Sequence, residues 1–498
     1  MSHVLDIQDL NVSFAGTAVL NHFSLALKPG EVWGVVGESG SGKSVGANFA
    51  MGLLPGTAEV TCGKALLNGT SFQHNSALEW RQLRGKVISM VFQDPMTALN
   101  PSMRIGPQVL EAITAHAKAS REDKSRVMKA LEEVELPAEE VFAKYPHELS
   151  GGQRQRVVIA IALMNNPKLI IADEPTTALD KEVEETVLKL LVDLVKRRGS
   201  ALWLVSHDMD VIKEVCDHMV VLYKGTTVEQ GTAKEVFSAP KHPYTQALLA
   251  CRPPKEGKPF PLPTVKDYLE GSLPKQEPLC NQVGEQPVIQ IEQLRIGYKV
   301  KRKTNWVVDG LDLSVMEGES VGLVGPSGSG KSSVGRAMVG LNAFESKAFK
   351  VLGMDWDAGE LPGQVQFIFQ DPFSSLNPSK TVAQVLGKAL RRHGVAKAER
   401  GAKSKELLEA VGLDQAALVK RPAEFSGGQR QRIGIARALA ANPKMLICDE
   451  SVSALDVSVQ AQVLNVLNDL KQQRGLSFLF ISHDPDVVRY FCDRTVHL

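Results

Sequence analysis

Two glycine-rich stretches of this sequence carry residue types suited to binding phosphate. They read GESGSGKS from Gly37 and GPSGSGKS from Gly325, and both fit G-x-x-x-x-G-K-[ST] between a strand-like run and a helical pattern. Glycine lets backbone N–H groups face a phosphate, the lysine reaches the terminal phosphates, and the last serine can ligate a metal ion. The candidate residues are Gly37, Ser39, Gly40, Gly42, Lys43 and Ser44, and their counterparts Gly325, Ser327, Gly328, Gly330, Lys331 and Ser332.

Two apolar runs end on an Asp-Glu pair and could supply the acidic groups of a metal-dependent hydrolysis. The runs KLIIADEP and KMLICDES look like buried parallel strands, and α/β sheets bind ligands at the carboxyl ends of such strands. We expect Asp173 and Asp449 to hold Mg²⁺ beside the loop serines. Glu174 and Glu450 would polarise the attacking water as general bases. One Asp-Glu pair alone would more often be a solvent-exposed strand end. The presence of a phosphate loop in the same half favours the metal-binding interpretation instead.

Other polar residues follow strand-like runs at matching places in the two halves. His207 follows ALWLVS and His483 follows SFLFIS. A single histidine is more often structural, but the equivalent pair indicates sensors of the terminal phosphate. Gln93 and Gln370 end two further runs, MVFQ and FIFQ, and are expected to touch the metal ion or the water.

The phrases ELSGGQRQR and EFSGGQRQR differ at a single residue, which shows that the sequence is duplicated. In each phrase a serine and two glycines precede a run with helical periodicity, so the first reading is a helix N-cap. An N-cap with exposed glycines is also an anion site, although each half already has a phosphate loop. The residues concerned are Ser150, Gly151, Gly152 and Gln153, and Ser426, Gly427, Gly428 and Gln429.

The length and the repeat together predict two α/β domains in tandem. A chain of 498 residues is too long for one core, and LIIADE/MLICDE, TALD/SALD and SHDMDV/SHDPDV recur in the same order. We expect domains over residues 1–252 and 286–498. The seven prolines near residues 253–285 favour an extended linker. Alternatively, this segment is a tail lying on the surface of the first domain.

The composition excludes several classes of protein. With 43% hydrophobic residues, 23% charged residues and a net charge of +1, nothing points to nucleic acid as a partner. No apolar run approaches the ~18 residues of a membrane span, and the start MSHVLDIQDL does not look like a signal peptide. The six cysteines are scattered, without metal-type spacing, as in a reduced cytosolic protein.

These motifs, in this order and in both halves, resemble those of a tandem pair of ATP-binding cassettes from ABC transporters. The resemblance covers nearly the whole chain. It implies two P-loop domains, each with a RecA-like core, an antiparallel β-region and a helical subdomain. It also implies ATP and Mg²⁺ as cofactors, with Ser44, Gln93 and Asp173, and Ser332, Gln370 and Asp449, at the metal ions.

The same resemblance implies that two ATP sites are shared between the halves, with the SGGQ phrase of one half capping the γ-phosphate held by the other. It thus explains why the phrase occurs twice. Adenine would stack on Phe14 in one site and on Tyr298 in the other. The first site would join Lys43, Ser44, Gln93, Asp173, Glu174 and His207 with Ser426, Gly427, Gly428 and Gln429, and the second would join Lys331, Ser332, Gln370, Asp449, Glu450 and His483 with Ser150, Gly151, Gly152 and Gln153.

The sequence segments between the motifs are similar to those of one branch of this family. FQDPMTALNPS, FQDPFSSLNPS and HPYTQALLA resemble the ATPases of dipeptide, oligopeptide and nickel importers, including fused ATPases that serve glutathione- or microcin-type peptides. The resemblance implies an ATPase that energises import of peptides or related small solutes. It implies two integral-membrane permease subunits as partners, an extracytoplasmic solute-binding protein acting indirectly, and a peripheral position at the cytoplasmic face of the inner membrane.

Three other classes of tandem ATPase are less compatible with the sequence. A sugar-importer ATPase commonly has one degenerate cassette, whereas both glutamates are kept here. A ribosome-associated ATPase has a long charged helical linker instead of a proline-rich one. DNA-repair ATPases insert zinc modules or coiled coils, for which we see no pattern.

The two halves also differ in ways that bear on partners. Ile161 stands where the second half has Arg437, and the spacing from Lys43 to Gln93 is 50 residues against 39 in the second half. The shorter spacing predicts a trimmed antiparallel β-region in the second domain. Leu498 aligns with Leu222, so we also expect a short C-terminal end there. Related subunits often carry a four-cysteine tail after HPYT, which Cys251 and Cys280 cannot supply, so we expect no iron–sulfur cluster.

By resemblance the segment after each glutamine forms a groove for a permease helix; the alternative is that its apolar residues pack the helical subdomain. The candidate anchors are Met96, Leu99, Phe373 and Leu376.

Overall fold

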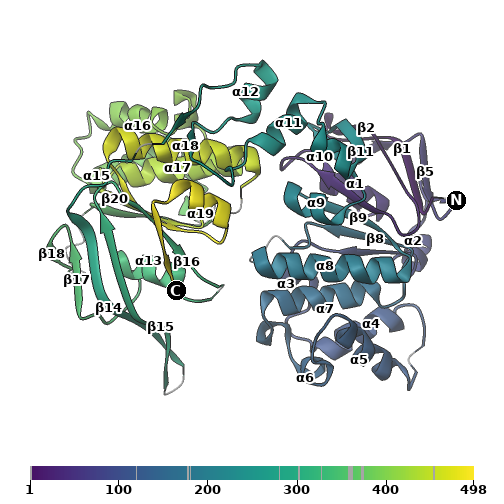
Figure 1. The fold of residues 1–498 in the computed structure, drawn as a ribbon. Coiled ribbons are helices and arrows are strands. Elements are labelled where there is room, and N and C mark those ends of the chain that lie inside the picture. The colour runs from purple at the N-terminus through teal and green to yellow at the C-terminus, as the bar shows by residue number, and fades with distance from the viewer. Residues whose placement is uncertain are drawn as a thin grey trace. The chain divides into compact units, whose positions relative to one another are not determined.

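The computed structural model divides the chain into two compact units, Met1–Leu249 and Ala250–Leu498. Each unit is described by itself (Figure 1). Ser327 and Phe373, both singled out above, lie outside the described residues. The structure describes residues 3–118, 120–176, 179, 181–279, 281–300, 303–326, 328–356, 363–371, 375–452 and 455–498.

The first unit is built around a parallel sheet. Its strands lie in the order β10, β3, β9, β8, β7, and four of them are buried along their whole length, as the continuous apolar runs predict. Because the strands are parallel, their carboxyl ends share one edge of the sheet. The bounds are β3 (Val32–Val36), β7 (Ile88–Val91), β8 (Leu169–Asp173), β9 (Ala201–Ser206) and β10 (His218–Tyr223).

An antiparallel β-region and a helical subdomain complete the first unit. Phe23 of β2 and Trp203 of β9, with ring centroids 5.9 Å apart, join the antiparallel strands to the core. Figure 1 shows α4, α5 and α6 gathered beside α7, away from β1 and β5. The remaining bounds are β1 (Leu5–Phe14), β2 (Thr17–Leu27), α1 (Lys43–Ala50), β4 (Ala58–Thr61), β5 (Lys64–Leu67), β6 (Thr70–Ser71), α2 (Ala77–Leu83), α3 (Pro95–Ala98), α4 (Ile105–Thr114), α5 (Asp123–Glu133), α6 (Ala138–Ala143), α7 (Gly151–Leu163), α8 (Lys181–Arg198), α9 (Met209–Val215), β11 (Thr226–Thr232), α10 (Ala233–Ser238) and α11 (Pro243–Ala250).

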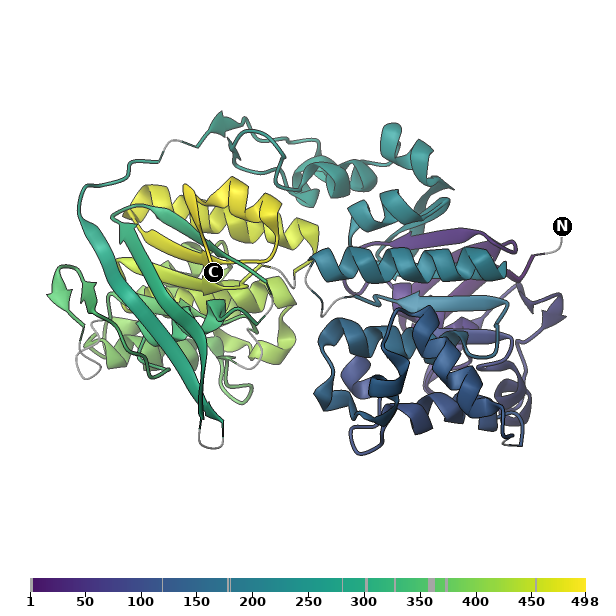
Figure 2. The ribbon, with the colours of Figure 1, turned by 60° about the horizontal axis from the view of Figure 1, so that its bottom comes forward.

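The second unit repeats this plan. Its parallel sheet has the order β19, β20, β21, β16, β22, and a separate antiparallel sheet has the order β15, β14, β17, β18. Figure 2 shows β14 and β15 as a long two-stranded ribbon within this unit. The bounds are β14 (Pro287–Val300), β15 (Lys303–Met316), β16 (Ser320–Val324), α13 (Lys331–Met338), β17 (Ala348–Val351), β18 (Met354–Asp355), β19 (Val365–Ile368), α15 (Val382–Arg392), α16 (Arg400–Glu409), α17 (Gly427–Leu439), β20 (Met445–Asp449), α18 (Val457–Arg474), β21 (Ser477–Ile481), α19 (Pro485–Phe491) and β22 (Arg494–His497).

Each unit thus has the predicted parallel core, antiparallel β-region and helical subdomain. The antiparallel region of the second unit is the smaller one: within its described residues, the place of β4 is taken by an isolated bridge between Arg295 and Glu345. None of the helices in the described parts of the chain combines the length and the apolar character needed to cross a bilayer.

The described part of residues 253–285, expected to form an extended linker, is packed against the second unit. The unit boundary falls before it, so the segment belongs to the second unit rather than to the surface of the first. Leu262 and Val265 are buried there, and the backbone N–H and C=O of Leu262 bond to the side-chain amide of Asn465 at 2.8 Å each. The apolar side chains between the prolines provide the surface that packs. The prolines favour the packing further, because they reduce the entropy that the chain loses when it is ordered.

The packed proline-rich segment also lies near a buried ion pair of the second unit. Lys471 Nζ lies 2.7 Å from Asp493 Oδ2, and the side chain of Lys471 is 3% exposed. Asn281, from the end of the segment, donates to Asp493 Oδ1 at 2.6 Å. In the first unit Val195 stands at the place of Lys471, and the neighbouring Lys196 lies 3.5 Å from Asp217 with both side chains about half exposed. The described part of residues 253–285 therefore supplies part of the packing of the second unit.

Replacing Leu262 should loosen the second unit locally. Leu262→Ala removes a fully buried side chain, and such changes lower the free energy of unfolding by about 2–5 kcal/mol. Hydrogen–deuterium exchange should rise at α18, which carries Asn465. Leu273→Ala, at an exposed position of the same segment, serves as the control and should leave exchange unchanged. Equal exchange in both variants would show that the segment does not stabilise α18.

Candidate functional site

The phosphate loop of the first unit begins where β3 ends. A Cβ atom added to Gly37 would lie 2.2 Å from the carbonyl oxygen of Leu222, so no other residue fits there without a shift of the backbone. Ser41 Oγ is buried in this loop with no hydrogen-bond partner among the described residues, and Ser329 Oγ repeats this in the second unit. A closely packed backbone cradle with an unpartnered buried hydroxyl fits a polar ligand such as a phosphate group.

Both loop lysines fold back over their own loop. Lys43 is 5% exposed, and its Nζ donates to the carbonyl oxygens of Gly37 at 2.6 Å and Glu38 at 3.0 Å. Lys331 Nζ donates at 2.8 Å to the carbonyl oxygens of Gly325 and Pro326. The ammonium group is thereby held at the mouth of the loop in each unit, where it can meet the terminal phosphates.

The loop serine and the strand-end aspartate meet in both units. Ser44 Oγ donates to Asp173 Oδ1 at 2.9 Å, and Ser332 Oγ donates to Asp449 Oδ1 at 2.7 Å. Burial raises the pKa of both aspartates. A cation would reverse this effect by favouring the charged carboxylate. A hydroxyl beside a carboxylate is an oxygen donor set that Mg²⁺ prefers, so these residues fit the ion that the sequence analysis expects.

The two glutamates that follow these aspartates have an unusual backbone. The φ angle is 44° at Glu174 and 46° at Glu450, in the left-handed region that residues other than glycine rarely adopt. Each backbone N–H nevertheless makes a hydrogen bond, to Val205 O at 3.0 Å and to Ile481 O at 2.9 Å. Strain retained at the same place in both units is typical of functional positions.

The predicted glutamine and histidine partners reach the same carboxylate. Gln93 Nε2 donates to Glu174 Oε2 at 3.0 Å, and His207 Nδ1 lies 3.5 Å from that oxygen. In the second unit Gln370 Nε2 donates to Glu450 Oε2 at 2.5 Å. His483 Nδ1 lies 3.7 Å from Glu450 Oε1, and this neighbouring imidazole holds the pKa of Glu450 below the usual range.

The prediction of an N-cap at each SGGQ phrase is confirmed. Ser150 and Gln153 form a capping box at the start of α7, and Ser426 and Gln429 form one at the start of α17. A Cβ atom added to Gly428 would lie 1.8 Å from Val459 Cγ1, so this glycine lets α17 approach α18 closely. The SGGQ phrase therefore has a structural role within its own unit, in addition to any role in binding ATP.

The two candidate adenine-stacking residues differ in accessibility. Tyr298 is 43% exposed, and its hydroxyl lies 2.8 Å from Ser333 Oγ and 3.1 Å from Asn342 Nδ2. Phe14 is only partly exposed and packs against the core of the first unit. Tyr298 thus presents a free ring face more readily than Phe14 does.

Tyr244 is a residue near the site that the sequence analysis did not select. It lies in the HPYT phrase, is fully buried, and accepts a hydrogen bond at 3.0 Å from the backbone N–H of Glu38 in the phosphate loop. Its ring packs on Tyr223 with centroids 4.3 Å apart. The only signal in the sequence was the phrase itself, which does not reveal a contact across about 200 residues.

Removing the Tyr244 hydroxyl should weaken nucleotide binding in the first unit. Tyr244→Phe leaves the N–H of Glu38 without this acceptor, and an unsatisfied buried donor costs about 1–3 kcal/mol. We expect a several-fold loss of ATP affinity at the loop of Lys43, measured by site-resolved nucleotide trapping. Tyr268→Phe, which removes a hydroxyl from α12 (Val265–Glu270), is the matched control. Equal affinity in the two variants would contradict a role in positioning the loop.

Comparison with known proteins agrees with this geometry. The family model described as ABC transporter matches residues 20–177 and 308–453, which make up more than half of the chain. The chain belongs to the ABC transporter family. The two units are its ATP-binding cassettes, and the chain is an ABC-type ATPase. A second model, described as the C-terminal region of oligopeptide/dipeptide transporters, matches residues 228–269.

Individual relatives extend over nearly the whole chain. The glutathione import ATP-binding protein GsiA of Escherichia coli strain K12 is 41% identical over 526 residues, which cover 99% of this chain and 84% of that protein. The protein of the same name from Shigella flexneri is similar to the same extent. Among solved structures, that of cbiO1 from Clostridium perfringens, part of an ABC transporter complex, is 30% identical and covers 48% of this chain and 92% of its own, with a TM-score of 0.43.

Proposed function

We propose that this chain is the ATPase subunit of an importer for small peptides, such as glutathione or a peptide of similar size. The observation that carries the proposal is the complete set of ATP-site residues in both units, together with a segment matching the C-terminal region of oligopeptide/dipeptide transporters. Relatives named for glutathione import support the choice of solute. A sugar-importer ATPase would more often have lost one of the two sets.

In this proposal each phosphate loop holds the terminal phosphates of ATP, with Lys43 or Lys331 at the γ-phosphate. Mg²⁺ would be held by Ser44, Gln93 and Asp173 in one site and by Ser332, Gln370 and Asp449 in the other. When bound, it would neutralise the charge that develops on the phosphate oxygens. The nucleotide would also contact Ser39, Gly40 and Gly42 in the first loop, and Gly328 and Gly330 in the second.

The glutamates are proposed to act on the attacking water. Glu174 and Glu450 orient the water and accept its proton as it attacks the γ-phosphorus, and the bond to the ADP oxygen breaks. Gln93 and Gln370 each hold one carboxylate oxygen, so the carboxylate is fixed in one orientation. His207 and His483, which lie beside the same carboxylates, would donate a hydrogen bond to the γ-phosphate.

We also propose that each ATP is shared, as the family resemblance implies. Ser426, Gly427 and Gly428 would cap the nucleotide bound at Lys43, and Ser150, Gly151 and Gly152 would cap the one at Lys331. Each serine begins a helix of 13 residues, whose N-terminal N–H groups and dipole favour an anion. The proposal gives the N-cap serines a second role beyond capping.

The membrane partners are proposed to be two permease subunits that carry the solute, fed by an extracytoplasmic binding protein. The chain would lie at the cytoplasmic face of the inner membrane, and no feature calls for nucleic acid. Of the predicted groove anchors, Leu99 and Leu376 are each 2% exposed, which favours the packing alternative for them. Met96 is 47% exposed, with its sulfur 2.6 Å from Arg154 Nη1, and remains the candidate contact.

Reconstitution tests the proposed function directly. The chain, its permeases and the binding protein in proteoliposomes should take up glutathione or a dipeptide only with ATP inside, and uptake should stop without the chain. Met96→Glu should reduce uptake about tenfold or more by placing a charge in an apolar contact, while its melting temperature matches wild type. Thr97→Glu, at the adjacent exposed position, is the control. Uptake at the wild-type rate by Met96→Glu would exclude this contact.

A further inference from the structure

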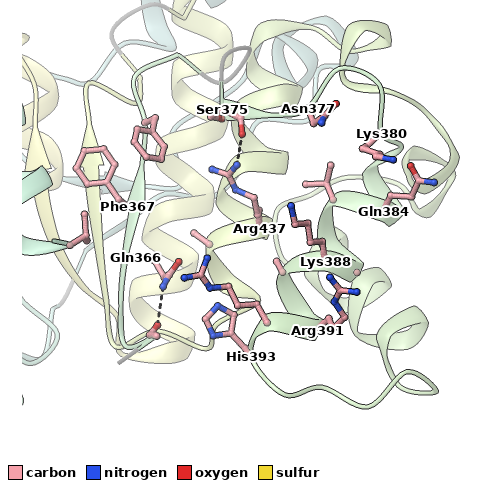
Figure 3. Close-up of a pocket in the computed structure, with 18 of the residues that line it drawn as sticks. Gln366, Phe367, Ser375, Asn377, Lys380, Gln384, Lys388, Arg391, His393 and Arg437 are labelled. Carbon is pink, nitrogen blue, oxygen red and sulfur yellow. Dashed lines mark hydrogen bonds between the residues drawn. The ribbon is translucent and has the colours of Figure 1, made fainter. Parts of the chain in front are cut away.

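The second unit differs from the first at two surfaces. One is a cavity of about 1260 Å³ between β19, α15 and α17, where Arg437 stands in place of Ile161 (Figure 3). This cavity adjoins the segment after Gln370 that is assigned above to the permease. The other surface is the face of α18 and α19 on which residues 253–285 pack, and it contributes no residue to the ATP sites described above.

Part of this proline-rich segment forms a small folded loop, residues 258–279, here called the strap. Its two ends pair as short antiparallel strands, β12 (Pro259–Phe260) and β13 (Glu277–Pro278), and α12 lies between them. The backbone N–H of Leu279 also donates to the carbonyl oxygen of Lys258 at 3.0 Å. Because its two ends are joined, the strap packs as one piece rather than as an extended chain.

Side chains of α18 and α19 hold the backbone of the strap. The hydroxyl of Tyr490 donates to Pro259 O at 2.9 Å, and the side-chain amide of Asn465 makes the two hydrogen bonds to Leu262 given above. Tyr490 and Leu262 are each 1% exposed, so both sides of the contact are buried. Buried backbone groups that lose such partners are costly, and this makes the strap dependent on these side chains.

The equivalent face of the first unit has different residues. At the matching places of the repeat, Lys189 replaces Asn465 and Glu214 replaces Tyr490. Lys189 and Glu214 pair with each other at 2.8 Å, and both side chains are about half exposed. A strap laid on that face would separate the pair and bury its charges, which is costly. The surface that fits the strap therefore belongs to the second unit.

We propose that the face of α18 and α19 is a docking surface for the strap, and that docking shortens the connection between the two cassettes. Docking begins at Lys258, whose Nζ donates to the carbonyl oxygen of Cys492 at 2.5 Å. With the strap docked, about 7 residues connect α11 to Lys258, whereas about 36 would connect α11 to β14 with the strap undocked. The effective concentration of one cassette for the other falls with the −3/2 power of this length, so undocking lowers it about tenfold.

The strap thus keeps the cassettes near each other when no nucleotide is bound. Docking itself does not depend on the proposed function, but its use in bringing the cassettes together rests on the proposed sharing of ATP.

A cut in the full chain tests whether docking holds the cassettes together without the covalent connection. A protease site is inserted between Gln282 and Val283, which are exposed and follow the strap. The first unit carries an affinity tag, and the cleaved protein is washed with EDTA in the absence of nucleotide. Cleaved wild type should retain most of its second unit, because the strap stays joined to the first unit and docked on the second. A chain with Asn465→Lys and Tyr490→Phe should retain at least about tenfold less, because the strap loses its hydrogen-bond partners.

Two further variants make the result specific. Leu262→Asp changes the strap instead of the surface, so it should give the same loss of retention without altering α18 or α19. Lys189→Asn, at the matching place of the first unit, is the control and should retain the second unit as wild type does. Hydrogen–deuterium exchange of the uncut chains is the second measurement. Residues 259–270 should exchange faster in the strap and surface variants, while β20 and β21 keep their protection if the second unit is folded.

Separation of the cleaved wild type would overturn the proposal, as would retention and strap exchange that are the same in the surface variant and in the control. Faster strap exchange without loss of retention would show that another contact joins the cassettes, and the role in shortening the connection would be wrong. ATP hydrolysis by the uncut wild type is measured in parallel. Its absence would count against the proposed function and leave the docking result unaffected.

Discussion

A chain carrying Glu174→Gln and Glu450→Gln should bind ATP with near wild-type affinity but hydrolyse it about 10²–10⁴ times more slowly. The substitution keeps the size of each side chain and removes the group that accepts a proton from water. The two glutamates stand at equivalent strained positions, with the same glutamine and histidine partners, so each single variant should inactivate its own site.

The measurement is phosphate release at saturating ATP, together with equilibrium binding of radiolabelled ATP. Glu132→Gln, an exposed glutamate of α5, is the control for a general loss of charge and should hydrolyse ATP normally. Wild-type turnover in either single variant would show that the glutamate of that site is not the general base.

Ser426→Arg should damage the ATP site of Lys43 and leave the site of Lys331 largely intact, although Ser426 belongs to the second unit. In the shared arrangement the arginine side chain would occupy the place of the γ-phosphate, and loss of one such anion contact lowers turnover about 10²–10³-fold. Ser150→Arg should give the reciprocal result.

Site-resolved trapping of a photoreactive nucleotide distinguishes the two sites. Ser426→Ala is the control for loss of the helix N-cap. That loss lowers the stability of the second unit by about 1 kcal/mol and does not place a bulky side chain at the proposed contact. Damage confined to the site of Lys331 would show that each unit completes its own site.

Short motifs determined which residues belong to the candidate sites. The loop lysine and serine, the Asp-Glu pair and the glutamine all stand at the ends of apolar runs, and such runs form parallel strands with their ends at one edge. That rule predicts two contacts between residues distant in sequence, that of Ser44 with Asp173 and that of Gln93 with Glu174. Because the sequence is duplicated, the same rule predicts the equivalent contacts in the second half.

Only the tertiary structure decided features that depend on packing between unrelated segments. Proline content describes the stiffness of residues 253–285 but not the surface on which Leu262 is buried. The hydroxyl of Tyr244 meets the phosphate loop because a late helix returns to an early strand end. Lys388 and Arg391 look in sequence like an ordinary solvated helix face, and become a basic cavity only when α17 brings Arg437 beside them. In each case the local pattern is compatible with several environments, and long-range packing selects one.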